Sequence, residues 1–146
     1  MSVSCIIPAY NEAARIAAVL EQVRAHPLID EVIVVDDGSA PATADWLAAQ
    51  THPNLRLWRQ PVNYGRAAAR NAGVCAARGE ALVFLDSDVI VRRDFLAAHA
   101  HTLGLAGEKG CDISKRWLTF DVSSSISGVE FIGLVHDMTG IPRHVD

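Results

Sequence analysis

The sequence has few cysteines, and they are not arranged for metal binding or cross-linking. Cys5, Cys75 and Cys111 form neither a CxxC pair nor a Cys/His pattern with ligand spacing. A disulfide framework is therefore not expected, and this cysteine usage is typical of a reducing compartment. Cys5 lies in an apolar run and Cys75 in an alanine-rich one, so both are predicted to be buried structural thiols.

Long hydrophobic runs and an excess of positive charge are also missing. No apolar stretch reaches the roughly 18 residues that a membrane helix needs. No basic segment precedes the first apolar run, so a cleaved signal peptide is not expected. The protein is predicted to be cytoplasmic, and a peripheral position at the inner face of a membrane stays open. The formal net charge of −4 argues against a nucleic-acid partner, although a local basic cluster and a metal could still hold a small anion.

What the sequence does have is a regular alternation of strand and helix patterns. Its 146 residues, half of them hydrophobic, suffice for one domain with a core. Strands are predicted at 3–7, 32–35, 55–58 and 81–85, with the third nearer the sheet edge. Helices are predicted after Asn11, at about 43–50, from the segment Asn63-Tyr64-Gly65 to about Arg78 with Gly79 as C-cap, and from Asp94 to about Leu103. The apolar face of the first helix is formed by Ile16, Val19, Leu20 and Val23. The inner face of the second helix is formed by Trp46 and Leu47.

This order predicts an α/β fold: a Rossmann-like, mostly parallel sheet flanked by helices, with right-handed connections. The regular strand and helix pattern is lost after Leu105, where glycines become frequent, so we divide the chain into residues 1–106 and an atypical segment, 107–146. In that segment we predict a strand at 117–122, a serine loop at 123–125 and a helix at 129–139.

Polar clusters follow three of the predicted strands: 8–12, 36–39 and 86–88. In open parallel sheets, ligands bind outside the carboxyl ends of the strands, where all three clusters would lie. Asp86 and Asp88 point the same way if the segment is extended, and could meet one cation. Carboxylate oxygens suit Mg²⁺ or Mn²⁺, and Mg²⁺ is often bound by one or two carboxylates plus substrate phosphates. The alternative is a turn acid followed by a capping residue.

The second cluster, Asp36-Asp37-Gly38-Ser39, combines a turn glycine with two adjacent carboxylates. One aspartate can form an Asx-turn and Ser39 can cap the next helix. That leaves the other aspartate to accept a hydrogen bond from a ligand. Gly38 permits a tight turn or a close approach of the backbone.

A third candidate group lies in the segment that leads into the third predicted helix and in its first turns. Asn63, Arg66 and Arg70 would share one helix face, and two guanidinium groups four residues apart could grip the oxygens of a phosphate. The alternative is a pair of solvated arginines on a surface helix. Together, the three groups describe a site for a nucleotide diphosphate with a divalent ion.

Four segments, in this order and spacing, resemble the nucleotide-binding half of family 2 glycosyltransferases, which have the GT-A fold. They are "VSCIIPAYNE" (3–12), "VIVVDDGS" (32–39), "NYGRAAARNAG" (63–73) and "ALVFLDSDV" (81–89). The resemblance implies a nucleotide-sugar donor, often a UDP-sugar. It also implies metal-dependent, inverting transfer, in which an acceptor hydroxyl attacks the anomeric carbon and an acid of the protein takes its proton.

The resemblance also implies roles for individual residues. The loop that wraps the nucleotide corresponds to Pro8, Ala9, Tyr10 and Glu12, and the acid that pairs with the base to Asp36 or Asp37. Arg66 and Arg70 correspond to the helix facing the base and phosphates. Asp86 and Asp88 correspond to the metal motif, with Asp88 as the direct ligand and Asp86 nearer the ribose.

Two departures from the family pattern lie downstream. The acidic motif that usually carries the catalytic base is not recognisable, so no residue is assigned that role. The chain is also shorter than the family's usual catalytic domain, which suggests a short or truncated version. The alternative to an active enzyme is therefore a nucleotide-sugar-binding module that lacks the acceptor half.

The acceptor could be a glycan, a lipid or a small molecule, and an exposed sheet edge would favour self-association. A phospho-accepting receiver domain shares the "VVDDGS" pattern but would carry its acid pair after the first strand.

Overall fold

The computed structural model describes residues 2–92, 94, 119–120 and 129–132. These residues form one six-stranded sheet with strand order β3-β2-β1-β4-β6-β5. The first four strands in that order are parallel, and β6 runs antiparallel to β4 and β5. The elements are β1 (Val3–Ala9), α1 (Ala13–Arg24), β2 (Glu31–Asp37), α2 (Pro41–Ala48), β3 (Leu55–Gln60), α3 (Arg66–Ala76), β4 (Ala81–Leu85), β5 (Thr119–Phe120) and β6 (Val129–Ile132).

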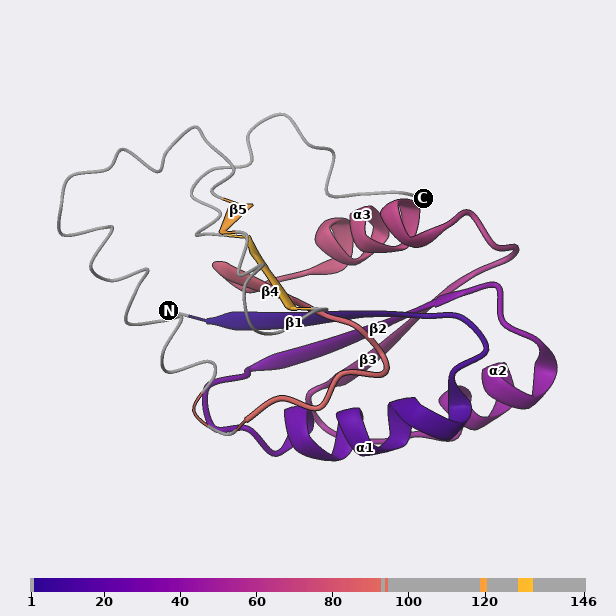
Figure 1. Cartoon of the computed structure of the whole chain (residues 1–146), viewed down its shortest axis with the longest axis horizontal. Helices are drawn as coiled ribbons and strands as arrows, with labels where there is room; N and C mark the ends of the chain where they lie inside the picture. Colours follow the sequence, from indigo (N-terminus) through magenta and orange to yellow (C-terminus); the bar gives the residue numbers. More distant parts are fainter. Residues whose placement is uncertain (1, 93, 95–118, 121–128, 133–146) are drawn as a thin grey trace, which may run out of the picture.

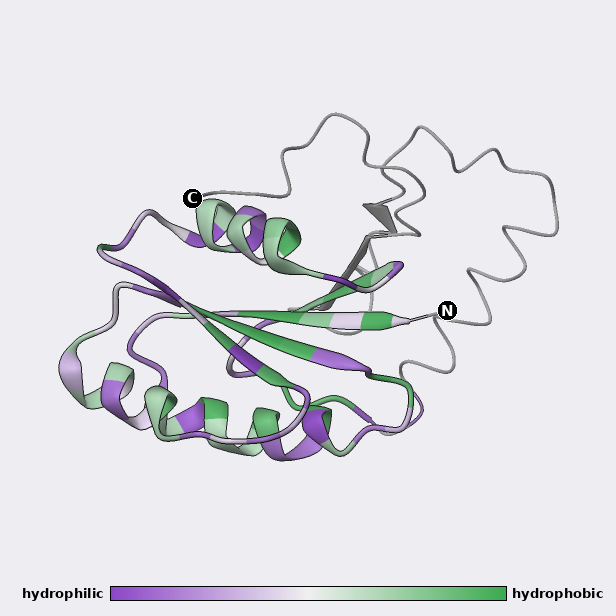
Figure 2. Ribbon diagram, turned by 180° about the vertical axis from the view of Figure 1, so that it is seen from behind, coloured by the Kyte–Doolittle hydropathy of each residue, from purple (hydrophilic) through white to green (hydrophobic). Residues whose placement is uncertain are grey.

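Helices cover both faces of the sheet, with α1 and α2 on one side and α3 on the other (Figure 1). Side chains of successive strand residues alternate between these two layers. In β1, Cys5 and Ile7 belong to the core under α1, whereas Ile6 belongs to the core under α3. Figure 2 shows strongly hydrophobic strands in the middle layer, and helices in which hydrophilic and hydrophobic residues are mixed. The predicted mostly parallel α/β sandwich is confirmed.

The predicted apolar face of the first helix is also confirmed. Ile16, Val19, Leu20 and Val23 are all buried against the sheet. In α2, Leu47 is buried and Trp46 is partly buried against the same core. No helix in the described ranges combines the length and the apolar character that crossing a bilayer requires.

Of the cysteines, Cys5 is fully buried, as predicted, and burial raises the pKa of its thiol to about 12. Cys75 is half-buried rather than buried. Cys111 lies outside the described residues. The prediction of structural thiols therefore holds for Cys5 and only in part for Cys75.

The third helix starts after Asn63-Tyr64-Gly65, as predicted, but ends at Ala76 and not near Arg78. It begins at Arg66 because Gly65, its N-cap, has a φ of +92°, and the Asn63 side chain accepts the Gly65 N–H in a turn that precedes the helix. It ends at Ala76, where Ala77 turns to an extended conformation. Gly79 is therefore not a C-cap; its N–H donates to the Ser4 hydroxyl at 2.9 Å instead.

The predicted helix at 129–139 is wrong at its start, because Val129–Ile132 is strand β6. Its register pairs Val83 with Phe131 and Leu85 with Val129. Hydrogen bonding to the edge of β4 thus overrides a helical spacing of apolar residues, and β-branched and aromatic side chains suit a strand. Strand β5 lies within the strand predicted at 117–122. The helix predicted after Asp94 and the serine loop at 123–125 fall outside the described residues, and the division at residue 107 stays a prediction.

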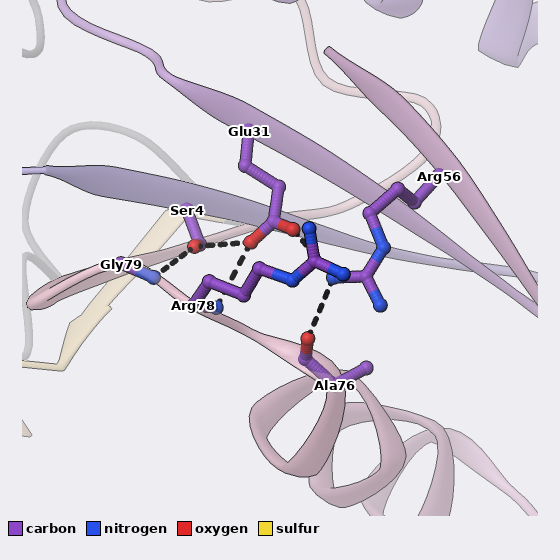
Figure 3. A network of polar contacts seen from close by, with 6 residues as sticks. All are labelled: Ser4, Glu31, Arg56, Ala76, Arg78 and Gly79. Carbon is purple, nitrogen blue, oxygen red and sulfur yellow. Dashed lines mark hydrogen bonds and ion pairs between the residues drawn. The ribbon is translucent and has the colours of Figure 1, made fainter.

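A polar network closes the end of the sheet opposite the polar clusters (Figure 3). The Glu31 carboxylate accepts hydrogen bonds from the Ser4 hydroxyl at 2.7 Å, the Arg56 guanidinium at 2.5 Å and the Arg78 backbone N–H at 3.0 Å. Arg56 also donates to the Ala76 carbonyl at 2.8 Å, at the last residue of α3. The network therefore joins β1, β2 and β3 to the end of α3.

Glu31 is expected to make the stability of the protein depend on pH. Burial raises the pKa of this carboxyl, but the hydrogen bonds from Arg56, Ser4 and Arg78 outweigh it and hold the pKa below its ordinary value of 4.5. The stabilisation is therefore present above that value and is lost as pH falls through the lowered pKa of the folded state. Urea unfolding measured from pH 7 to pH 3 should show that the wild type is more stable than Glu31→Gln at pH 7 and that this difference in the free energy of unfolding decreases as the pH falls below 4.5. An advantage that stays constant over this range contradicts the role assigned to Glu31.

Candidate functional site

A cleft of about 460 Å³ opens at the carboxyl ends of the parallel strands. It lies where the strand order reverses, since β1 is flanked by β2 on one side and β4 on the other. Crevices at this position are where open α/β sheets bind ligands. The cleft is lined by Pro8, Ala9, Tyr10, Glu12, Asp37, Asn63, Gly65, Arg66, Ala69, Asp86, Ser87 and Asp88.

Most of the predicted site residues meet in this cleft. Nine of its lining residues were predicted from the sequence, and they come from the carboxyl ends of β1 and β2, from the segments after β1, β3 and β4, and from the first residue of α3. Two predicted residues, Asp36 and Arg70, are not among the lining residues. Three lining residues, Gly65, Ala69 and Ser87, were not predicted, although each lies inside a quoted motif and their small size opens the cleft floor.

The structure distinguishes the two aspartates that the sequence left as alternatives. Strand β2 continues through Asp37, so Asp36 points to the layer of Val34 and Asp37 to the layer of Val35. Asp36 is completely buried; its Oδ1 accepts the Ser39 N–H at 3.0 Å, and its Oδ2 lies 3.5 Å from Arg59 Nε. Asp37 is the carboxylate that lines the cleft.

Asp37 also fixes the wall of the cleft that precedes α3. Its two carboxylate oxygens accept the backbone N–H groups of Tyr64 at 2.8 Å and Gly65 at 2.9 Å. These bonds hold the start of α3 against the end of β2 and leave each oxygen a second lone pair. Asp37 therefore shapes the loop and can still accept a hydrogen bond from a ligand.

The two arginines of α3 do different things, contrary to the shared phosphate-binding face that was predicted. Arg66 lines the cleft. Arg70 lies one turn further along the helix, where Nη2 is 3.2 Å from Asp86 Oδ1 and the guanidinium lies 5.7 Å from the Phe84 ring centroid. Asp86 is thereby oriented by a partly buried arginine.

Asp86 and Asp88 lie in a turn and not in an extended segment. The Val89 N–H donates to the Asp86 carbonyl at 3.2 Å, which closes the turn just after β4. Both carboxylates nevertheless line the cleft. Among the described residues, no group of three or more Asp, Glu, His or Cys side chains could hold a metal ion. One or two carboxylates with substrate phosphates and water are a common way to bind Mg²⁺, so the chemistry of Asp86 and Asp88 fits such a cation.

A residue that sequence reasoning missed joins the first two loops. Asn11 adopts a φ of +55°, and its side-chain oxygen accepts the Ala40 N–H at 2.8 Å while its own N–H donates to the Ser39 hydroxyl at 3.0 Å. The predicted capping role of Ser39 is therefore wrong, because the N-cap of α2 is Ala40 and has no side-chain cap. Asparagine is one of the few residues that tolerate a left-handed backbone conformation. The asparagine at position 11 could therefore have indicated this role from the sequence, but only if the geometry of the turn had been known.

Comparison with known proteins agrees with this architecture. A family model described as "Glycosyl transferase family 2" matches residues 4–110. The succinoglycan biosynthesis protein ExoO of Rhizobium meliloti is 42% identical over 106 residues, which cover 72% of this chain and 30% of that protein. The dolichyl-phosphate beta-glucosyltransferase ALG5C of Trichomonas vaginalis is 37% identical over 100 residues, covering 61% of this chain and 30% of that one. The chain thus spans about a third of the length of these relatives.

Solved structures share the fold. The S. aureus TarS fragment 1–349 in complex with UDP-GlcNAc superimposes with a TM-score of 0.63 and 28% identity, covering 73% of this chain and 32% of that one. The mannosyltransferase PcManGT of Pyrobaculum calidifontis, in complex with GDP-Man and Mn²⁺, superimposes with a TM-score of 0.58 and 35% sequence identity. The match covers 65% of this chain and 30% of that one. The parallel sheet with its flanking helices is of the GT-A type. On its fold, its cleft and the match over residues 4–110, the chain belongs to glycosyl transferase family 2.

Proposed function

We propose that the cleft binds a nucleotide-diphosphate sugar together with a divalent cation, and that the protein takes part in inverting transfer of the sugar to a hydroxyl acceptor. The observation that carries this proposal is that carboxylates, an arginine and an exposed tyrosine from separate segments of the chain line one cleft. The complexes of TarS with UDP-GlcNAc and of PcManGT with GDP-Man and Mn²⁺ support it.

The nucleoside end of the donor would lie between the β1 loop and the start of α3. The Tyr10 ring, 48% exposed at the cleft, offers an aromatic surface to the nucleotide, and Pro8, Ala9 and Glu12 form the wall beside it. Asp37 would accept a hydrogen bond from the base, because each of its oxygens keeps a lone pair. Asn63 lines the same end of the cleft, and Arg66 provides the cationic group for a phosphate.

The cation would be Mg²⁺ or Mn²⁺, held by Asp88 with Asp86 beside it. The Asp88 side chain is 48% exposed and its ion pair with Arg15 is long, at 3.6 Å, so it can exchange Arg15 for a metal ion. Asp86 is oriented by Arg70 and would face the ribose or share the ion. When bound, the cation would neutralise charge on the departing diphosphate.

The remaining step is attack by the acceptor hydroxyl on the anomeric carbon, with loss of its proton to a base. No described residue is assigned as that base, and the acceptor is open among glycans, lipids and small molecules. A nucleotide-sugar-binding module is the second candidate. It is favoured by the cleft itself, whose lining provides groups for a nucleotide, a phosphate and a cation, whereas no described residue is assigned as a base.

Calorimetric titration with UDP, GDP and dTDP, each with and without Mn²⁺, tests the proposal. We expect one nucleoside diphosphate to bind, and to bind more tightly with Mn²⁺ present. Failure of all three to bind under both conditions refutes the donor site. If one binds, release of free sugar from the matching nucleotide sugar distinguishes the two candidates, because a pure binding module releases none.

A further inference from the structure

Arg15 lies beside the cleft without lining it, and none of the predicted roles involves it. It is the third residue of α1, and its side chain is 64% exposed. Its Nη1 lies 3.6 Å from Asp88 Oδ2, and its Nε lies 3.5 Å from Glu12 Oε2. The guanidinium therefore bridges two cleft carboxylates that come from different loops.

The position of this arginine is electrostatically unusual. The first turn of a helix is the positive end of its dipole, where a cation is disfavoured. The first turn of α1 contains no acidic residue that could offset this charge. The favourable interactions of Arg15 are thus those with Glu12, which precedes the helix, and with Asp88 across the cleft.

The carboxylates of the cleft differ in how firmly they are held. Asp37 accepts two backbone N–H groups, and Asp86 is paired with the partly buried Arg70. Within residues 2–92 and 94, the ion-pair partner of Asp88 is Arg15 alone, at a long distance and with both side chains widely exposed. Exposed pairs of this kind are weak and easily exchanged.

We propose that Arg15 is the counter-ion that Asp88 exchanges for the divalent cation, so that Arg15 sets the affinity of the site for metal. This inference rests on the proposed metal site. Without metal, Arg15 neutralises Asp88; when the metal binds, Arg15 gives up Asp88 and keeps Glu12. It is a positioning residue. It lowers the affinity for the metal in two ways: its guanidinium competes with the metal for Asp88, and its positive charge repels the metal ion.

The test is the dissociation constant of Mn²⁺ alone, measured from the electron paramagnetic resonance signal of free Mn²⁺. Arg15→Gln should bind Mn²⁺ about threefold to tenfold more tightly than the wild type at low salt, the range expected for an exposed ion pair and a screened repulsion. The difference should shrink as salt is added. Arg15→Lys, which keeps the charge, should stay near the wild-type value.

Arg24→Gln is the matched control, because it makes the same change in charge at the last turn of the same helix. It should leave the affinity unchanged. If Arg15→Gln binds Mn²⁺ no more tightly than the wild type or Arg24→Gln, the role of Arg15 is refuted while the metal site stands. If neither the wild type nor any variant binds Mn²⁺, either alone or in the presence of UDP, GDP or dTDP, the proposed metal site fails, and this inference fails with it.

Discussion

Asp88→Asn is expected to abolish the effect of Mn²⁺ on nucleotide binding. Asp88 is the more exposed of the two proposed metal-site carboxylates, with its side chain 48% exposed against 20% for Asp86, and an amide oxygen carries no charge to attract the ion. Loss of metal-dependent affinity should be at least about 10-fold, since even outer-shell partners of metal ligands contribute 10- to 100-fold. Calorimetry with the tightest-binding nucleoside diphosphate, with and without Mn²⁺, measures this effect as a ratio of two dissociation constants.

The same substitution should act in the opposite direction when the metal is left out. A negative charge is removed from a cleft that receives an anionic diphosphate, so nucleotide affinity without Mn²⁺ should stay equal or increase. The protein should remain folded, because the exposed ion pair with Arg15 contributes about 0–1 kcal/mol. Asp45→Asn, an exposed carboxylate on α2, is the control for charge. An unchanged Mn²⁺ effect in Asp88→Asn would contradict its role as a metal ligand.

Gly38→Ala is expected to lower the free energy of unfolding substantially, and more than Gly65→Ala does. Gly38 has a φ of +71°, and a Cβ atom there would lie 2.4 Å from the Val62 carbonyl carbon and 2.5 Å from the Asn63 nitrogen. Both are backbone atoms, so the loops after β2 and β3 must move apart. Left-handed strain costs about 1–2 kcal/mol, and overpacking about 1–3 kcal/mol more.

The chain contains its own control for the two contributions. Gly65 also has a positive φ, +92°, but a Cβ atom there has no neighbour within 4 Å. Gly65→Ala therefore reports backbone strain without a steric neighbour, and its ψ of 161° places it in a region that costs a non-glycine residue about 1–3 kcal/mol. Urea unfolding should show a smaller loss for Gly65→Ala than for Gly38→Ala. A loss for Gly38→Ala of no more than about 1–2 kcal/mol, the left-handed strain alone, would show that the close approach of the loops contributes nothing.

Local patterns predicted the layers of this fold well, because their causes are local. The β-branched run at 32–35 and the spacing of Ile16 and Val23 each determine which side chains face the core, whatever the rest of the chain does. The residues that converge on the cleft followed from one further rule, that parallel strands present their carboxyl ends at the same edge.

The errors arose where the partner is distant in sequence. Assigning Asp37 and not Asp36 to the cleft requires knowing that β2 runs through both residues, since one step of the pleat exchanges their faces. The pairing of Arg70 with Asp86 and of β6 with β4 joins segments far apart in the chain. No spacing of residues within one segment contains this information, and the helix predicted at 129–139 failed for the same reason.

The two hydrogen bonds of Asn11 bear on how this site could be redesigned. Because they tie the loop after β1 to the loop after β2, the two loops form one module, and neither can be grafted from a relative without the other. An engineer who seeks a different nucleotide preference should therefore exchange residues 8–12 and 36–40 together. The left-handed backbone at position 11 further limits that exchange to donors with asparagine, aspartate or glycine there.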